Sequence, residues 1–348
     1  MKALRIHGPG DLRVDELAVS RPAVDETVIR IEYGGICGSD LHYWREGAVG
    51  ASVLRAPMTL GHEVVGTVVR ASADGSGPAE GDLVVPHPAQ TCGVCEWCRN
   101  GQRHLCAACR YLGSAAQWPH TDGGFVTELT IPMTRLIPVP SGMTAQRAVL
   151  AEPASIAWHA VSRVEQAGSR LVGADVLVVG GGPIGLLVGA IAQHRGTGSV
   201  SVVDVHDHPL RVAREVGLHD VFRVGEQLPT VDIAFESSGT AAGLACALRA
   251  VGRGGTVVAV GQLPAVDASV PAWLVVTNEL TVTGSLRLDT EIPAALGFLA
   301  APGLNIDAIV THVHEFADAT RAFAVAGDVN LSSKVLLRFA ETSGQAED

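Results

Sequence analysis

The chain has 348 residues, a length that favours two domains, and its 47% hydrophobic and 18% charged residues exclude an intrinsically disordered protein. A formal net charge of −11 argues against a surface that binds nucleic acid or anionic membranes in general. The first residues turn polar before any long apolar run, and glycines and Pro183 interrupt the most apolar segment, 176–193. We therefore expect a cytoplasmic protein with no signal peptide and no membrane span.

The N-terminal part has the pattern of short strands joined by tight turns. Apolar segments of strand length occur at 4–8, 27–34, 63–72 and 81–87. We expect a β-rich, partly barrel-like domain over residues 1–150. Residues 287–348 are expected to return to it and to end in a frayed tail, AETSGQAED.

A first candidate metal site lies in the motifs GGICGSDLHYW and LGHEVVG. Cys37, His62 and Glu63 offer a thiolate, an imidazole and a carboxylate, and Glu152 in AEPAS offers a second carboxylate. Three mixed protein ligands with one open coordination position are the catalytic arrangement for zinc. Asp40 is placed to orient a ligand, although it is also an ordinary turn residue.

Two further polar residues of the same motif suit a proton relay. Ser39 supplies a hydroxyl and His42 an imidazole, and such groups pass a proton from a buried site to solvent. The alternative is that both are turn residues after a strand.

Four cysteines fall within the fifteen residues of CGVCEWCRNGQRHLC. Disulfides are rare in a reducing cytosol, and a thioredoxin-like C-x-x-C would not explain a third and a fourth cysteine. Four thiolates at this spacing suit a closed, structural zinc site. The predicted ligands are Cys92, Cys95, Cys98 and Cys106; from the residues alone, Cys109 competes with Cys106.

A dinucleotide-binding motif follows in DVLVVGGGPIGLLVGAIAQHRG, which we predict to be a strand, a glycine turn and a helix. The pyrophosphate would lie on the N-terminus of this helix. Asp204 ends the next predicted strand, where an acid accepts the ribose hydroxyls and repels a 2′-phosphate, so NAD is favoured over NADP. A solvated acid at a strand end is the alternative. The predicted cofactor contacts are Gly180, Gly182, Pro183, Ile184, Gly185, Asp204, Gly261 and Ser285.

The chain continues with alternating strands and helices. Strands are predicted at 231–239, 256–262 and 280–286, with a helix over 244–255. This alternation is typical of a parallel sheet with crossover helices, so residues 151–286 are expected to form a doubly wound α/β domain.

In this order, the motifs resemble those of the zinc-dependent medium-chain dehydrogenase/reductases, almost from end to end. HYWREGAVG, YLGSAAQWPHTDGGF and GSLRLDTEI resemble the polyol dehydrogenase branch. The resemblance implies a GroES-like catalytic domain with a structural zinc lobe at 90–110, and a Rossmann domain that binds NAD. It also implies a homodimer or homotetramer.

The resemblance implies two zinc ions per chain and assigns their ligands. Cys37, His62 and Glu63 would hold the catalytic zinc, while Glu152 would be a further ligand or a water- or metal-linked acid; the choice of third ligand stays open. The x7 spacing to Cys106 is the family's, and Ser39 and His42 fall on its proton-relay positions. One position departs: where relatives often carry an arginine near the adenosine, this chain has Pro209, for which Arg211 or His206 would have to substitute.

These features predict a zinc- and NAD-dependent dehydrogenase acting on a secondary alcohol of a small polyol or sugar acid. Tyr43, Glu152 and Arg287 are the predicted substrate contacts. A guanidinium binds a carboxylate bidentately, which favours a sugar acid such as L-idonate, oxidised at C5 to 5-keto-D-gluconate. Alternatives are a sorbitol/xylitol-type or L-threonine dehydrogenase, with Arg287 paired to Glu152 or Asp289. A structural NAD-binding protein is the non-enzyme alternative, but it would have no need of the open metal site.

Overall fold

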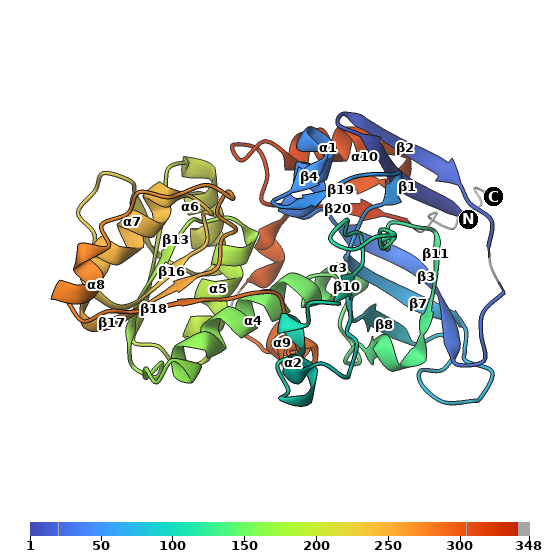
Figure 1. Cartoon of the computed structure of the whole chain (residues 1–348), viewed down its shortest axis with the longest axis horizontal. Coiled ribbons are helices and arrows are strands. Elements are labelled where there is room, and N and C mark those ends of the chain that lie inside the picture. Colours follow the sequence, from blue (N-terminus) through green and yellow to red (C-terminus); the bar gives the residue numbers. More distant parts are fainter. Residues whose placement is uncertain (20, 304, 340–348) are drawn as a thin grey trace, which may run out of the picture.

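The computed structural model describes residues 1–19, 21–303 and 305–339, and the tail expected at 340–348 lies outside them. A body built on a parallel sheet and a body built on mainly antiparallel sheets lie side by side, with helix α4 (Ala151–Gln166) running between them (Figure 1). This architecture confirms the predicted fold class of a doubly wound sheet plus a β-rich, GroES-like part.

The parallel sheet has the strand order expected of a dinucleotide-binding fold. Numbered along the chain, its six strands lie in the order 3-2-1-4-5-6, with the topological switch point between β13 and β16. The strands in spatial order are β15 (Asp220–Arg223), β14 (Ser199–Asp204), β13 (Asp175–Val179), β16 (Val231–Glu236), β17 (Val251–Ala259) and β18 (Thr281–Gly284).

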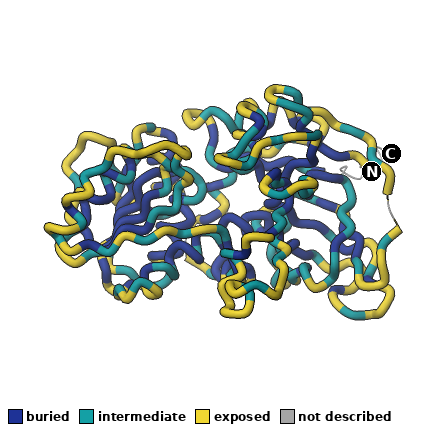
Figure 2. The backbone as a smooth tube through the Cα atoms, viewed as in Figure 1, coloured by how far each residue is buried: buried dark blue, intermediate teal, exposed yellow. Residues whose placement is uncertain are grey.

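Helices bury both faces of this sheet. Val176 and Val178 of β13 belong to a core formed with α4, α5, α6 and α9, whereas Leu177 and Val179 belong to a core formed with α7 and α8. Because alternate residues of a strand point to opposite faces, burial on both sides explains the uninterrupted apolar run VLVV that follows Asp175. The strands therefore run through the dark, buried centre of this body in Figure 2.

The C-terminal end of one predicted helix is wrong. The helix expected over 244–255 is α7 (Ala241–Ala250), and the following VGRGG already belongs to β17. Three glycines in this stretch disfavour a helix, and Gly254 adopts a positive φ of 73° beside a register irregularity in the pairing of β16 and β17.

The second body is built around a seven-stranded sheet that joins distant parts of the chain. Strand β3 (Glu26–Gly35) pairs with β7 (Glu63–Arg70) on one side and with the late strand β20 (Lys334–Arg338) on the other. The remaining strands are β8 (Leu83–Pro86), β11 (Glu128–Pro132), β12 (Leu136–Pro138) and β19 (Val310–Glu315). The small sheets comprise β1 (Lys2–Gly8), β2 (Asp11–Glu16) and β6 (Met58–Thr59); β4 (Ala48–Val49) and β5 (Ser52–Val53); and β9 (Ala89–Gln90) and β10 (Arg110–Tyr111).

The helices of both bodies are mostly short. They are α1 (Gly38–Glu46), α2 (Glu96–Arg99), α3 (Ala145–Ala148), α5 (Pro183–His194), α6 (Asp207–Val216), α8 (Trp273–Thr277), α9 (Ile292–Ala300) and α10 (Ala319–Ala326). Single 3₁₀ turns lie at Arg103–Leu105, Met133–Arg135, Ile306–Ile309 and Phe316–Asp318. Over the described ranges, none of the helices combines the length and apolarity needed to cross a bilayer.

Candidate active site and metal centres

Strand pairing brings the two predicted ligand segments together. Gly35 at the end of β3 lies opposite Glu63 at the start of β7, so that Cys37, the N-cap of α1, lies beside the His62–Glu63 pair. One sulfur, one imidazole nitrogen and one carboxylate oxygen of Cys37, His62 and Glu63 lie within 4.8 Å of one another. His62 and Glu63 are buried, which holds these donor atoms in a protein environment rather than in bulk water.

Asp40 fixes the position of both ligand segments. Its fully buried carboxylate accepts the backbone N–H of Cys37 at 2.9 Å and that of Gly61 at 3.2 Å. Burial raises the pKa of Asp40 above its usual value, and the nearby His62 offsets only part of this increase. One side chain on α1 therefore sets the distance between the backbone that carries Cys37 and the backbone that carries His62.

The two candidate third ligands each have a partner within the protein. Both oxygens of Glu63 accept from the Lys334 ammonium at 2.7 Å, and this pair is almost completely buried. Glu152, in the first turn of α4, accepts the Tyr111 hydroxyl at 2.6 Å and lies outside the 4.8 Å group among the described residues. Removing one member of a buried ion pair leaves an uncompensated charge at a cost of about 3–5 kcal/mol, so this contact ties Glu63 firmly to Lys334.

The electrostatics of the cluster suit a cation. Burial opposes the charged form of His62, yet Cys37, Asp40 and Glu152 together raise its pKa well above the usual range. Burial also raises the pKa of Glu152 to about 7. Groups that favour the protonated form of a buried imidazole create a negative electrostatic potential around it. A bound divalent cation would neutralise this potential in place of the proton. Thiolate, imidazole and carboxylate are also the donor set of catalytic zinc, so these residues fit that metal.

Ser39 and His42 lie one helical turn apart on α1. Ser39 is half-buried next to the ligand Cys37, whereas the His42 side chain is 57% exposed and contacts Glu46 at 3.1 Å. The proton relay expected from the sequence therefore stays a prediction.

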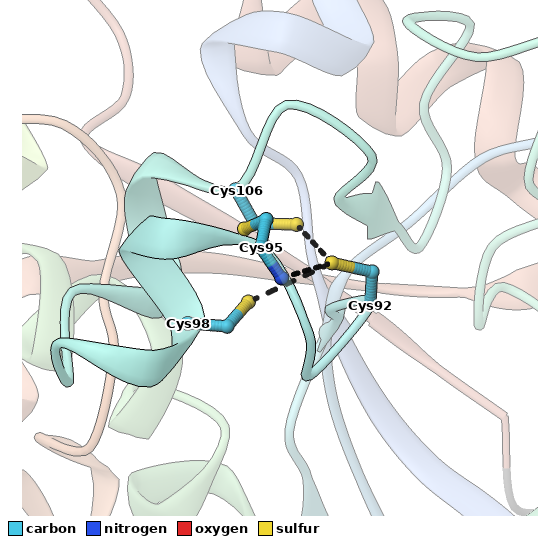
Figure 3. Close-up of side chains that lie close together, drawn as sticks. All are labelled: Cys92, Cys95, Cys98 and Cys106. Atoms are coloured by element: carbon cyan, nitrogen blue, oxygen red, sulfur yellow. Dashed lines mark hydrogen bonds between the residues drawn. The ribbon is translucent and has the colours of Figure 1, made fainter.

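The four predicted cysteines of the lobe converge. The sulfurs of Cys92, Cys95, Cys98 and Cys106 lie within 4.8 Å of one another (Figure 3). Cys92 Sγ lies 3.9 Å from Cys98 Sγ and 3.6 Å from Cys106 Sγ, close to the separation of about 3.8 Å between thiolates bound tetrahedrally to zinc. Backbone amides of Val94 and Cys95 lower the pKa of Cys92 to about 6. The site fits a structural zinc ion, and Cys109 lies outside it among the described residues.

The lobe is anchored to the segment that carries Arg287. Its base is the β9–β10 pair, in which Tyr111 lies opposite Ala89. Farther along the lobe, the backbone N–H and Nε of Arg103 donate to Asp289 at 2.8 and 2.9 Å. His87 contacts the Asp289 carbonyl at 2.7 Å, so this turn is held from two sides.

The glycine turn between β13 and α5 has the geometry that a bound pyrophosphate requires. Gly180 has a φ of 100°, and a Cβ on Gly185 would lie 1.9 Å from the Gly180 carbonyl oxygen. Gly182, the N-cap of α5, faces open space, because a Cβ at this position would have no neighbouring atom within 4 Å. Pro183 and Ile184 form the first, half-buried helical turn. The open space at the helix N-terminus fits a dinucleotide phosphate.

The other predicted cofactor residues line the carboxyl ends of the parallel strands. Asp204 ends β14, and its carboxylate accepts the N–H groups of Gly181 at 2.7 Å and His206 at 2.8 Å. A Cβ on Gly261 would lie 2.2 Å from the amide nitrogen of Gly239. The Ser285 hydroxyl is buried without a hydrogen-bond partner in the described structure, which is consistent with a ligand group at this edge.

The structure also shows the environment of Pro209, near the predicted adenosine position, and of Glu236, at the end of β16. Pro209 is buried against Gly181, and Arg211 is exposed, 4.0 Å from Glu215 on the same helix. Fully buried Glu236 accepts the N–H groups of Ser238 and Gly239 at 2.8 and 3.0 Å.

The three predicted substrate residues have different environments. The Tyr43 hydroxyl is buried and accepts the Ala115 N–H at 2.9 Å, so it connects α1 to the segment after the lobe. Glu152 lies beside the metal cluster, and Arg287 has a positive φ of 57°, with its guanidinium 5.7 Å from the centre of the Tyr111 ring. Tyr111 and Lys334 were not predicted, because only the folded chain brings them to these carboxylates.

Comparison with known proteins places these sites in a family. Residues 23–141 match the alcohol dehydrogenase GroES-like domain and residues 183–301 match the zinc-binding dehydrogenase domain. The chain is 32% identical to the L-idonate 5-dehydrogenase (NAD(P)(+)) of Escherichia coli K-12 over 93% of this chain and 96% of that protein. It is 31% identical to the sorbitol dehydrogenase of Bacillus subtilis, over 89% of each chain. The solved structure of L-idonate 5-dehydrogenase from Escherichia coli K-12 matches with a TM-score of 0.90 and 31% identity over 97% of both chains.

We expect two zinc ions per chain, one in each cluster, with separable roles. Cys37→Ser should lose one zinc ion and activity at an unchanged melting temperature. Cys98→Ser should lose the other and unfold at a lower temperature, because structural zinc contributes roughly 10 kcal/mol or more to folding in small peptides. Metal analysis and thermal unfolding would measure both, with Cys246→Ser as a control outside the clusters. An unchanged melting temperature in zinc-depleted Cys98→Ser would contradict the structural assignment.

Two glycine substitutions should separate folding from cofactor binding. Gly185→Ala should lower the free energy of unfolding by at least about 1–3 kcal/mol, because its methyl group would collide with the Gly180 backbone. Gly182→Ala should leave thermal stability unchanged but weaken NAD binding, since its methyl group would project into the open phosphate space. Calorimetric unfolding and NAD titration would measure the two effects. Unchanged NAD affinity in Gly182→Ala would place the pyrophosphate elsewhere.

Proposed function

Because the chain belongs to the zinc-binding alcohol dehydrogenase family, we propose that it oxidises a secondary alcohol of a sugar acid with NAD as the hydride acceptor. The family establishes the class, a zinc-type alcohol or polyol dehydrogenase. The observation that carries the finer proposal is the environment of Arg287, a cation near the catalytic cluster whose charge no carboxylate neutralises at close range among the described residues.

The residues of the cluster divide the chemistry between them. Cys37, His62 and one of the carboxylates Glu63 and Glu152 would hold zinc, which as a Lewis acid favours loss of the proton from a substrate hydroxyl. Asp40 keeps the ligand segments at a fixed separation. The proton would leave past Ser39 to His42 at the surface. The glycine turn would hold the dinucleotide, which would supply the hydride acceptor.

Nearby carboxylates are already engaged, which supports a substrate role for Arg287. Asp289 is paired with Arg103, and Glu152 accepts the Tyr111 hydroxyl. Among the described residues, no carboxylate oxygen lies within 4.0 Å of the Arg287 guanidinium, so the alternative of an internal ion pair gains no support. A guanidinium binds a carboxylate much more strongly than a neutral hydroxyl, which favours a sugar acid such as L-idonate over sorbitol.

NAD is the proposed cofactor because Asp204 ends β14 at the ribose position of such folds. Its carboxylate would repel the 2′-phosphate of NADP. The name of the Escherichia coli relative includes both cofactors, so the acceptor is part of the assay below. The alternative of a non-catalytic NAD-binding protein would have no need of the Cys37, His62 and Glu63 cluster, whose donor set is that of catalytic zinc. A reducing, cytoplasmic location is the proposed setting for the cysteine thiolates.

We also propose that the chain forms a homodimer through β18 or a homotetramer built from such dimers. This strand is an edge of the parallel sheet, and Val282 on it and Trp273 and Val276 on α8 are 45%, 65% and 84% exposed. An apolar, unpaired edge favours pairing with a second copy. Light scattering should give a mass of two or four chains, and Val282→Lys should reduce it. A monomeric wild-type protein would contradict the proposal.

The substrate proposal predicts a preference that depends on Arg287. The wild-type protein should have a higher kcat/KM for L-idonate than for sorbitol, xylitol or L-threonine, with NAD preferred to NADP. Arg287→Ala should lower kcat/KM for L-idonate roughly ten- to hundredfold, the range for losing hydrogen bonds to a charged group, and should change sorbitol little. Steady-state kinetics on all four substrates would decide. Equal losses for L-idonate and sorbitol would exclude a carboxylate contact and leave the general polyol assignment.

A further inference from the structure

Tyr111 contacts three functional groups at once. Its hydroxyl donates to Glu152 Oε1 at 2.6 Å, and its ring forms a T-shaped pair with the His62 ring, with the ring centres 5.7 Å apart. The guanidinium carbon of Arg287 lies 5.7 Å from the ring centre, within the range of a cation–π interaction. The side chain therefore lies between a ligand of the catalytic cluster, a carboxylate beside that cluster and the proposed substrate-binding cation.

The backbone around Tyr111 is held firmly. The residue lies on β10, paired with β9 at the base of the zinc lobe, five residues after Cys106. The lobe also donates from Arg103 to Asp289, two residues after Arg287. The ring and the guanidinium that lies near it are thus each tied to the same lobe.

The aromatic ring matters for Arg287 because the residue has an uncommon backbone conformation and a charge that no ion pair neutralises among the described residues. Its φ of 57° is uncommon for a residue with a side chain, and the described structure gives its guanidinium no ion-pair partner. A long side chain without fixed contacts loses several rotamers when it binds a ligand, and an aromatic face reduces that cost by restricting the guanidinium beforehand.

We propose that Tyr111 is a positioning residue for substrate selection: its ring holds Arg287 for the substrate carboxylate, and its hydroxyl holds Glu152 beside the metal cluster. The inference rests on the proposed sugar-acid dehydrogenase function and adds the residue that connects the two ends of the substrate site. In this proposal Glu152 acts near the reacting hydroxyl of the substrate, and Arg287 acts at the substrate carboxylate. The contact of Tyr111 with Glu152 should therefore affect kcat, and its contact with Arg287 should affect KM.

Two substitutions in the zinc-loaded, full-length protein separate these contacts. Tyr111→Phe keeps the ring and removes the hydroxyl, so it should lower kcat for L-idonate and sorbitol by the same factor and leave the ratio of their KM values unchanged. Tyr111→Leu also removes the aromatic face, so it should raise KM for L-idonate roughly three- to thirtyfold, the range of a cation–π interaction, with little change for sorbitol. Zinc content and melting temperature check that each variant is folded, and Tyr111→Met replaces the leucine variant if that one is not.

A double-mutant cycle with Arg287→Ala tests whether the ring acts through the guanidinium. In the Arg287→Ala background, Tyr111→Leu should no longer raise KM for L-idonate. Full additivity of the two substitutions, or equal KM changes for L-idonate and sorbitol, would overturn the role of the ring, and an unchanged kcat in Tyr111→Phe would overturn the role of the hydroxyl. A wild-type protein that prefers sorbitol would overturn the proposed function and the ring's role with it. A preference for L-idonate without coupling would overturn the role of the ring and leave the proposed function standing.

Discussion

The buried pairing of Lys334 with Glu63 is the constraint on which the catalytic cluster depends. The ammonium donates to both Glu63 oxygens and to the Ile36 carbonyl, with 4% of its side chain exposed. Burial disfavours its charge, but the adjacent Glu63 carboxylate raises the pKa of Lys334 above its usual value. Neither charge is stable here without the other, so β20 must lie against the backbone leading to Cys37 and against the start of β7. The positions of the candidate ligands thus depend on the Lys334–Glu63 ion pair, a contact within the protein that does not involve the substrate.

The zinc lobe has a part in this arrangement that a purely stabilising element would not have. Its four thiolates leave no position for a substrate, so the zinc ion of the lobe would take no part in the reaction itself. In this chain its base carries Tyr111, which donates to Glu152, and Arg103 connects its 3₁₀ turn to Asp289. The lobe therefore touches the site from two directions, through a hydroxyl and through the turn that follows Arg287.

Local spacing was enough to predict some parts of the molecule and not others. The four cysteines and the glycine turn each lie within a short stretch, so their spacing alone limits how the backbone can place them. Lys334 and Glu63 are 271 residues apart and Tyr111 and Glu152 are 41 apart, and no local pattern indicates which partner a buried carboxylate will find. The helix predicted over 244–255 was too long. Its alanine-rich first half does form a helix, but the glycine-rich residues from Val251 onward belong to strand β17. Tyr43 shows the same limit: a tyrosine beside a motif gives no sign that its hydroxyl bonds to the Ala115 backbone.

The pairing of β3 with β20 has a consequence for the order in which the molecule can be completed. Leu336 lies opposite Gly35, so the antiparallel body is closed by residues from nearly the end of the chain, whereas the strands of the parallel sheet all lie between Asp175 and Gly284. A nascent chain that has emerged as far as residue 300 contains that whole sheet, but it lacks β19, β20 and the ammonium that neutralises Glu63. Domains fold as units during synthesis, and pairing between distant segments is slow. The candidate metal cluster can therefore be completed only after β20 has been synthesised, whereas all the strands of the parallel sheet are available earlier.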